Sequence, residues 1–190
     1  MKKIAFVNGK GGSGKTTLCI LTAIAASKSN YHVGIIDTDP QQSMFSWITN
    51  TKPENIEPVQ NGHSYDLIIM DTPPRLDDPK LVQNLQQVDD IIVVSSLSPA
   101  DILTTERTIA MLQQNKLDHR AKLLINQYRK NTVLAKNEES IVGKFPIRRM
   151  ANKLATRQAY QMVALFGWDA LAGKNVEINE VQSVILEIFK

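Results

Sequence analysis

A glycine-rich segment close to the first residue constrains the fold more than any other part of this sequence. Residues 8–17 read Asn-Gly-Lys-Gly-Gly-Ser-Gly-Lys-Thr-Thr and contain the pattern G-x-x-x-x-G-K-[ST]. The fixed positions of the pattern are filled by Gly9, Gly14, Lys15 and Thr16. An apolar run at 4–7 precedes the segment, and a helix-compatible run at 16–27 follows it. Strand, loop and helix in this order are the context in which the pattern forms a phosphate-binding P-loop.

The residue types of this segment fit the chemistry of a polyphosphate. Successive glycines let the backbone approach the phosphates with its N–H groups pointing inward, and the following helix directs its positive end at the same charge. We expect Lys15 to reach the β- and γ-phosphates and the Thr16 hydroxyl to bind Mg²⁺. The residues of the segment that are predicted to contact the nucleotide are Gly11, Gly12, Ser13, Gly14, Lys15, Thr16 and Thr17.

Aspartates follow two further apolar runs, both of which are predicted to be buried strands. Asp37 and Asp39 lie at the end of the first run, and Asp71 closes the second in the pattern of a Walker B segment. Because ligands bind at the carboxyl ends of the strands in open α/β sheets, these carboxylates indicate a site for Mg²⁺ or for a reacting water. The alternative for the first pair is an Asx-type turn and N-cap before a helix at 41–49.

The rest of the sequence alternates apolar runs with helical periodicity. Strands are predicted at 4–7, 32–37, 65–71, 91–94 and 121–125, with an edge strand at 144–147. Helices are predicted at 17–28, 41–49, 78–87, 99–116, 132–143 and 177–189, and the polar stretch 50–62 is predicted to be a loop with at most a short strand. The expected fold class is α/β: a doubly wound, mostly parallel sheet with helices on both faces, in one domain over residues 1–190.

Composition excludes several classes of protein. A single cysteine, Cys19, rules out a disulfide within the chain and is too few for an iron–sulfur cluster, which fits a reducing cytoplasmic setting. No apolar run approaches the roughly 18 residues of a membrane span. The acidic residues of the last predicted helix, Glu177, Glu180 and Glu187, favour packing against the core over membrane anchoring, so no membrane partner is expected.

The densest basic cluster lies at 148–157, although the formal net charge of only +3 does not by itself indicate a nucleic-acid binder. Its candidates for contacting DNA phosphates are Arg148, Arg149, Lys153 and Arg157. Clustered lysines and arginines bind phosphates without reading the base sequence. The alternative for this cluster is an ordinary solvated face.

A second lysine inside the loop, Lys10, links the sequence to a known family. The string Lys-Gly-Gly-Ser-Gly-Lys-Thr-Thr resembles the deviant Walker A motif of ParA/MinD-class P-loop ATPases, and Asp-Thr-Asp-Pro-Gln at 37–41 resembles the switch I segment of ParA proteins. The segment 72–75 resembles switch II, and within it Arg75 is either a switch residue or a solvated loop arginine. The resemblance is specific at 8–17, good at 37–42 and 66–75, and vague after about residue 130.

The resemblance implies a role for individual residues. Lys10 would reach across a dimer to the partner's nucleotide, Asp39 would orient the attacking water, and Asp37 would support the Mg²⁺ shell; Lys10, Lys15 and Asp39 are thus the catalytic candidates. The Asn-Lys-x-Asp motif of Ras-type GTPases is absent at the end of the 121–125 run. An asparagine at this strand end contacts adenine in ParA-like proteins, so Asn126 favours ATP over GTP; the alternative for Asn126 is a turn residue.

The implied protein is a Mg²⁺-dependent ATPase similar to the small plasmid-partition subgroup that includes ParF. ATP would assemble a sandwich homodimer, with higher-order assembly left open, and the dimer would bind non-specific double-stranded DNA on the nucleoid. A ParB-like centromere-binding partner would stimulate hydrolysis, and the cycle would segregate a plasmid or chromosome. The alternatives are a ParA-like ATPase that positions a protein cargo or acts in conjugative transfer, and a metabolic P-loop enzyme, against which Lys10 and the switch I segment argue.

Overall fold

The computed structural model describes residues 1–189 and contains one seven-stranded sheet in which all pairings are parallel. The strands are β1 (Lys2–Val7), β2 (Val33–Asp37), β3 (Ile56–Pro58), β4 (Leu67–Asp71), β5 (Asp90–Ser95), β6 (Ala121–Ile125) and β7 (Arg148–Arg149). Their order across the sheet is β3-β2-β4-β1-β5-β6-β7. The predicted fold class is therefore confirmed.

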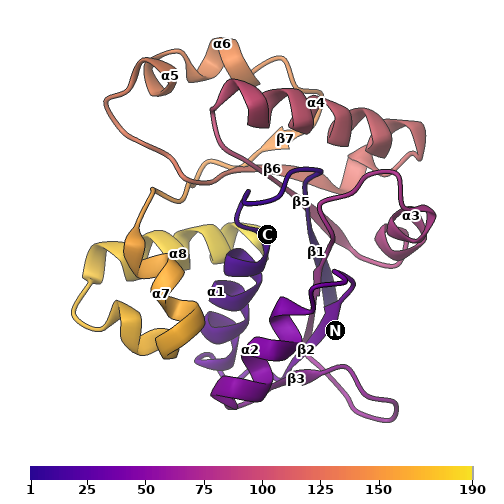
Figure 1. The fold of residues 1–190 in the computed structure, drawn as a ribbon, viewed down its shortest axis with the longest axis vertical. Coiled ribbons are helices and arrows are strands. Elements are labelled where there is room, and N and C mark those ends of the chain that lie inside the picture. Colours follow the sequence, from indigo (N-terminus) through magenta and orange to yellow (C-terminus); the bar gives the residue numbers. More distant parts are fainter. Residues whose placement is uncertain (190) are drawn as a thin grey trace.

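Helices cover both faces of this sheet, as Figure 1 shows. They are α1 (Lys15–Ser27), α2 (Ser43–Thr51), α3 (Pro79–Leu85), α4 (Pro99–Gln114), α5 (Val133–Lys136), α6 (Glu138–Val142), α7 (Gln158–Phe166) and α8 (Asn175–Ile188). Two short 3₁₀ helices, η1 (Asp118–Arg120) and η2 (Gly167–Leu171), complete the described elements. No helix of the described residues is long and apolar enough to cross a membrane.

Two apolar cores lie on either side of the sheet because alternate residues of each strand point to opposite faces. In β1, Ile4 and Phe6 pack in the core shared with α1, α2, α7 and α8, whereas Ala5 and Val7 pack in the core shared with α3, α4 and α6. All four side chains are fully buried. Burial on both faces explains why the central strands read as continuous apolar runs in the sequence.

The sheet order places the first strand at the centre, where the direction of winding reverses. β1 lies between β4 and β5, so the loops that follow these three strands meet at one edge of the sheet. Ligands of open α/β proteins bind at this kind of switch point, outside the carboxyl ends of the strands. The glycine-rich loop leaves β1 at this position.

The structure differs from the expected elements mainly after residue 130. The single helix predicted at 132–143 is two short helices, α5 and α6, because Asn137 between them leaves the helical conformation, with φ of −103° and ψ of 16°. The edge strand predicted at 144–147 was wrong. Phe145 and Ile147 pack against the core from a loop, and only Arg148 and Arg149 pair with β6.

Smaller differences concern element ends and one unpredicted helix. Helix α2 begins at Ser43 rather than at 41 because Gln42 adopts a left-handed conformation with φ of 49°. The loop expected at 50–62 contains the short strand β3, which the sequence reading allowed. Helix α7 was not predicted; it packs against α1 and presents its buried Tyr160 and Val163 to the core.

Candidate nucleotide site

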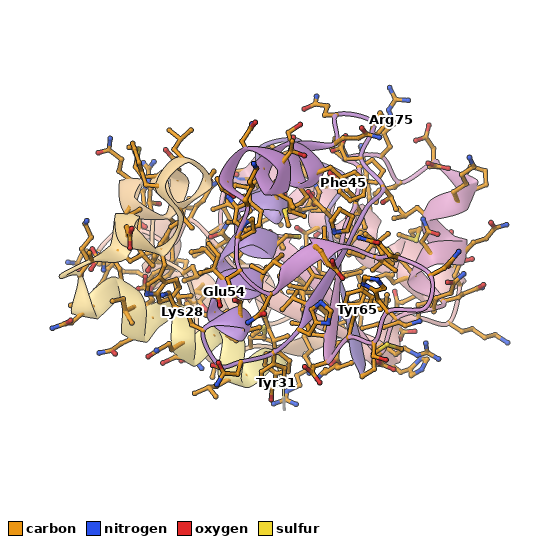
Figure 2. All side chains as sticks on the ribbon, turned by 90° about the horizontal axis from the view of Figure 1, so that it is seen from below. Lys28, Tyr31, Phe45, Glu54, Tyr65 and Arg75 are labelled. Atoms are coloured by element: carbon orange, nitrogen blue, oxygen red, sulfur yellow. The ribbon has the colours of Figure 1, made fainter. Side chains whose placement is uncertain are left out.

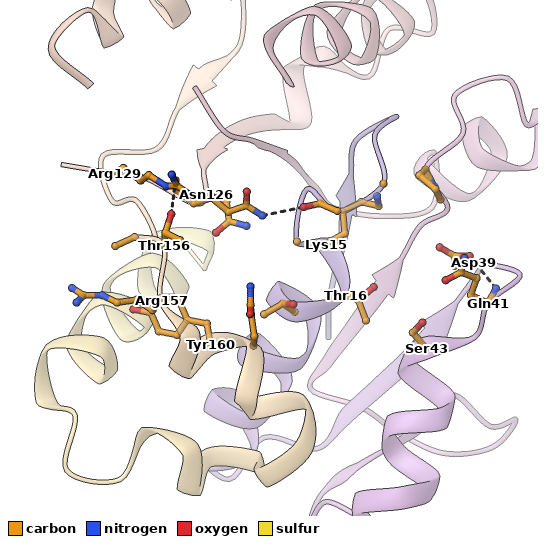
Figure 3. A pocket seen from close by; sticks show the side chains of 18 residues that line it. Lys15, Thr16, Asp39, Gln41, Ser43, Asn126, Arg129, Thr156, Arg157 and Tyr160 are labelled. Atoms are coloured by element: carbon orange, nitrogen blue, oxygen red, sulfur yellow. Dashed lines mark hydrogen bonds between the residues drawn. The ribbon is translucent and has the colours of Figure 1, made fainter. Parts of the chain in front are cut away.

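A cavity of about 550 Å³ opens at the carboxyl edge of the sheet, beside the glycine-rich loop (Figure 3). Its lining includes Gly11, Gly12, Gly14, Lys15, Thr16 and Thr17 from the loop and the first turn of α1. Asp39, Gln41 and Ser43 approach from the β2–α2 connection, and Asn126, Gln127 and Arg129 from the end of β6. The loop that the sequence predicts to bind phosphates therefore forms one wall of a cavity with the volume of a small-molecule site.

The loop has the backbone conformation of a phosphate cradle. Gly12 and Gly14 adopt left-handed φ values of 78° and 95°, which only glycine adopts without strain. A side chain at Gly14 would also collide with the Asn126 amide, because an added Cβ would lie 2.3 Å from its Nδ2 atom. At the other end of the loop, an added Cβ at Gly9 would lie 2.8 Å from the Leu76 side chain. Gly14 is thus required by close packing as well as by conformation, Gly12 by conformation and Gly9 by close packing.

Lys15 is the buried cation of the cavity. Its side chain is 7% exposed, and its Nζ lies 3.3 Å from the carbonyl oxygen of Lys10. Burial lowers the pKa of Lys15, and the nearby carboxylates of Asp71 and Asp39 partly oppose this shift. A buried ammonium without an ion-pair partner among the described residues is suited to an anionic ligand such as a phosphate.

Thr16 and Asp71 meet below the cavity. The Thr16 hydroxyl donates to Asp71 Oδ2 at 2.6 Å, and Asp71 Oδ1 is buried without a hydrogen-bond partner in the described part of the chain. Burial raises the pKa of Asp71 to about 6. An oxygen donor set with one unpartnered carboxylate oxygen fits Mg²⁺, which is commonly held by one or two protein oxygens together with substrate phosphates.

The two switch I aspartates have different surroundings. Asp37 accepts hydrogen bonds from the backbone N–H groups of Asp39 at 3.0 Å and of Met44 at 2.9 Å, so it caps the start of α2 as the alternative interpretation expected. Asp39 lines the cavity, and its Oδ1 accepts from the Gln41 N–H at 3.0 Å. The residue predicted to orient the water therefore faces the cavity, and the roles of both aspartates stay predictions.

Lys10 points into a different space. Its ammonium forms an ion pair with Asp101 of the same chain, in a neighbouring cavity of about 370 Å³ that Ser96, Gln127 and Leu134 also line. Asp101 is 4% exposed and also accepts a hydrogen bond from the Ser96 hydroxyl. Burial alone would raise the pKa of Asp101, but these two donors outweigh it and lower that pKa. The predicted intermolecular role of Lys10 requires this pair to open.

Asn126 lies at the predicted position but is largely engaged by protein. It is 8% exposed, and its Nδ2 donates to the Ser13 carbonyl at 2.8 Å. It also lines the cavity. A contact with adenine stays a prediction, and a contact with the loop is what the described structure contains.

The basic cluster is split by the edge of the sheet. Arg149 lies 2.7 Å from Glu139, and Lys153 pairs with Glu138, both on α6. Arg157 instead lines the nucleotide cavity, with its guanidinium 3.6 Å from Glu177 of α8. Arg148 is exposed and lies beside Asn152 and Glu187 in a shallow cavity on the α8 side. The four residues do not form one continuous basic face, and their role in DNA binding stays a prediction.

Several residues of the site were missed by sequence reasoning. Asp101, Gln127 and Gln161 line the two cavities but belong to no local motif. Their positions depend on contacts between segments far apart in the sequence, so no signal within the sequence could have identified them. Arg75, which was left undecided, is exposed and extends outward from the switch II segment (Figure 2).

Comparison with known proteins agrees with this geometry. Residues 4–157 match the model of the CobQ/CobB/MinD/ParA nucleotide-binding domain. The chain is 31% identical over 118 residues to maintenance of carboxysome distribution protein A of Gloeobacter kilaueensis, a match that covers 56% of this chain and 54% of that protein. It therefore spans about half the length of this relative. A second relative with the same name, from Halothiobacillus neapolitanus, is 26% identical over 183 residues, covering 86% of this chain and 84% of the relative.

The fold also matches solved structures. A plasmid partition protein from Borrelia burgdorferi bound to AMPPNP superposes with a TM-score of 0.79 at 21% sequence identity, over 99% of this chain and 98% of that one. At this identity the likeness concerns the fold. The family match covers the strands, the glycine-rich loop and both acidic segments of the cavity. This chain belongs to the CobQ/CobB/MinD/ParA family of nucleotide-binding domains.

Proposed function

We propose that this protein is an ATPase that uses a cycle of ATP binding and Mg²⁺-dependent hydrolysis to position a large cargo inside the cell. The observation that carries the proposal is the convergence of Lys15, Thr16 and Asp39 on one cavity, with Asp71 directly behind Thr16. These groups correspond to a phosphate-binding cation, a metal-binding hydroxyl, a water-orienting carboxylate and a metal-shell carboxylate.

The chain's own residues divide the work of hydrolysis. The loop N–H groups and Lys15 bind the phosphates, and Asp39 holds the attacking water in line with the γ-phosphate. Thr16 and Asp71 would hold Mg²⁺, with Asp37 in support, and the ion would supply neutralisation of the charge on the phosphates. Lys10 of a second copy would add a further positive charge, so hydrolysis would need an ATP-bound dimer.

The cargo that we favour is a protein assembly. Two relatives of the chain are named for the maintenance of carboxysome distribution, and one of them matches most of this chain. A plasmid is the second candidate, and the likeness to a plasmid partition protein supports it at the level of the fold. In both cases the ATP dimer would bind non-specific DNA on the nucleoid, and a partner attached to the cargo, ParB-like in role, would stimulate hydrolysis.

The catalytic part of the proposal is tested with Asp39→Ala. This variant is expected to bind ATP as the wild type does but to hydrolyse it at least tenfold more slowly, because the water loses the group that orients it. The measurement is steady-state phosphate release with Mg²⁺, alongside equilibrium binding of a fluorescent ATP analogue. Wild-type turnover by Asp39→Ala would remove this residue from the mechanism.

The DNA part is tested by binding to random-sequence duplex DNA with ATP, with ADP and without nucleotide, at two salt concentrations. We expect binding that needs ATP and weakens as salt rises, because phosphate contacts release counterions. Binding that ignores the nucleotide would contradict the switch. Absence of DNA binding in all three nucleotide conditions would leave the ATPase proposal unaffected and would exclude nucleoid DNA as the surface on which the protein acts.

The cargo is tested in the source cell by deleting the gene. Loss of an unselected plasmid over generations would support partition. Clustering or uneven inheritance of a protein assembly, with the plasmid retained, would support positioning of a protein cargo. The variant Lys15→Ala expressed from the native locus should reproduce the deletion phenotype in either case, because the cycle depends on nucleotide.

A further inference from the structure

Two consecutive side chains at the end of β6 hold two carbonyl groups of the glycine-rich loop. The Asn126 amide donates to the Ser13 carbonyl at 2.8 Å, and the Gln127 amide donates to the Gly12 carbonyl at 3.0 Å. The loop and the end of β6 are separated by more than 110 residues in the sequence, with separations of 113 and 115 for the two bonds. The contact is therefore tertiary and is not part of the P-loop motif.

The orientation of these carbonyls determines where the loop N–H groups point. A trans peptide is planar, so its C=O and N–H groups point in opposite directions. Drawing the Gly12 carbonyl toward Gln127 turns the Ser13 N–H the other way, and drawing the Ser13 carbonyl toward Asn126 does the same for the Gly14 N–H. Both carbonyls are held by groups of the β6 end, so neither is free to rotate toward bound phosphates, where a carbonyl oxygen would repel them.

Gln127 maintains this contact in a backbone conformation that glutamine seldom adopts. Its φ is +53°, in the left-handed region, where residues other than glycine are strained. It also lines both the nucleotide cavity and the neighbouring cavity that holds Lys10. A glycine here would relieve the backbone strain and would lose the amide that reaches Gly12. Glutamine at this position therefore strains the backbone and at the same time supplies the hydrogen bond to the Gly12 carbonyl.

We propose that Gln127 is a positioning residue for nucleotide binding, which acts by holding the Gly12 carbonyl away from the phosphates. This inference rests on the proposed function, since it assumes that the loop binds a nucleoside triphosphate. Asn126 acts in the same way on Ser13. Gln127 is the residue to test, because Asn126 is buried and also lines the part of the cavity assigned to the base.

The test compares three variants by thermal unfolding and by equilibrium binding of a fluorescent ATP analogue with Mg²⁺. Gln127→Gly removes the amide and the strain, whereas Gln127→Asn keeps a residue that tolerates the left-handed region but is one methylene too short to reach Gly12. Lys116→Gly is the matched control. Lys116 has a φ of +57°, is exposed, and follows the end of α4 that lies at the opposite edge of the sheet.

We expect Gln127→Gly and Gln127→Asn to bind the analogue roughly three- to tenfold more weakly than the wild type, the range for loss of one hydrogen bond. Gln127→Gly should melt at or above the wild-type temperature, because its backbone strain is gone. Lys116→Gly should gain stability in the same way and bind the analogue as the wild type does. Weaker binding by a protein that is not less stable is a result that a merely structural role would not produce.

Three results would overturn the inference. One is wild-type affinity in both Gln127 variants. The second is a loss of affinity in Lys116→Gly equal to that in Gln127→Gly, which would indicate a general effect of backbone flexibility. The third is a fall in melting temperature in both Gln127 variants large enough that partial unfolding explains their weaker binding. Failure of the wild type to bind the analogue would instead overturn the proposed function, before any variant is compared.

Discussion

Two lysines of the glycine-rich loop, five positions apart, have separate surroundings, so we expect their substitution to have different effects. Lys15 is buried in the nucleotide cavity, whereas Lys10 forms its ion pair with Asp101 in the neighbouring one. We expect Lys15→Ala to abolish detectable ATP binding and turnover. Lys10→Ala should retain ATP binding within a few-fold and lose turnover, since in the proposed mechanism its charge acts only across a dimer. Parallel binding and phosphate-release assays separate the two, and unchanged turnover in Lys15→Ala would exclude the P-loop assignment.

Burial of Asp71 makes a prediction about pH. Its folded pKa of about 6 lies above the roughly 3.9 of an unfolded aspartate, so between these values the folded state holds a proton that the unfolded state has lost. The stability that this residue contributes therefore falls as the pH rises from about 4 to 6 and stays lower above that, by roughly 2–3 kcal/mol.

Asp71→Asn, which cannot ionise, is the comparison for this effect. Both proteins are unfolded thermally from pH 4 to pH 8, without Mg²⁺ or nucleotide. The stability of the variant relative to the wild type should rise up to about pH 6, and the difference should stay constant above that pH. A difference that does not change with pH would mean that the carboxylate ionises as freely in the folded state as in the unfolded one.

Helix α6 neutralises part of the basic cluster, which is a property of two packed elements that the sequence did not reveal. Glu138 and Glu139 lie against Lys153 and Arg149. If this edge binds DNA, the double variant Glu138→Gln, Glu139→Gln should bind duplex DNA more tightly in the ATP state. The slope of the logarithm of its DNA-binding constant against the logarithm of the salt concentration, its salt slope, should steepen by up to about 2. This is roughly one for each cation that gains a phosphate contact.

The matched control for this prediction is Glu54→Gln, which removes an exposed acidic charge. Glu54 lies just before β3, at the other end of the strand order from β7 and the basic cluster. It should leave the salt slope unchanged. Equal slopes for the wild type and the double variant would exclude this edge from the DNA contact and direct the search to other cations.

Elements were predictable where a local pattern determines them. The central strands are buried on both faces, so their apolar runs identified them within one or two residues, as at β6, where prediction and structure agree. Helix α7 was not predicted because its start carries no capping residue and because its exposed Leu165 and Phe166 interrupt the helical period of the apolar residues. The two-residue strand β7 escaped because polar arginines form it, while the apolar residues before it pack from a loop.

The candidate site divides along the same line. The glycine-rich loop, Asp39 and Asp71 were predictable because each belongs to a segment in which spacing carries the chemistry. The ion pair of Lys10 with Asp101 spans 91 residues, and no spacing rule connects its two members. Asp37 was ambiguous from the sequence, and the structure contains the capping contact.

At the scale of the whole molecule, the pair of Lys10 and Asp101 would oppose the assembly of the proposed dimer. If Lys10 reaches a second copy, it must first leave Asp101, so breaking the pair would be part of the cost of association. Asp101→Asn keeps a hydrogen-bond partner for Ser96 and removes the charge that holds Lys10. We expect this variant to dimerise at a several-fold lower protein concentration with a non-hydrolysable ATP analogue, measured by sedimentation.

The same variant without nucleotide is the control and should remain as monomeric as the wild type. If Asp101→Asn and the wild type dimerise at the same protein concentration, the ion pair does not oppose association. Weaker dimerisation would mean that Asp101 itself belongs to the interface.

The long separation between the glycine-rich loop and the end of β6 has a consequence during synthesis of the chain. The loop is among the first segments to leave the ribosome, yet the amides that hold Gly12 and Ser13 follow 115 and 113 residues later. At roughly 5–20 residues per second this interval lasts about 6 to 23 seconds. The neighbouring strands β4 and β5, which flank β1 in the sheet, also emerge within it. A nascent chain therefore carries the full motif long before the contacts that hold the loop can form, and those contacts need about two thirds of the protein to have been made.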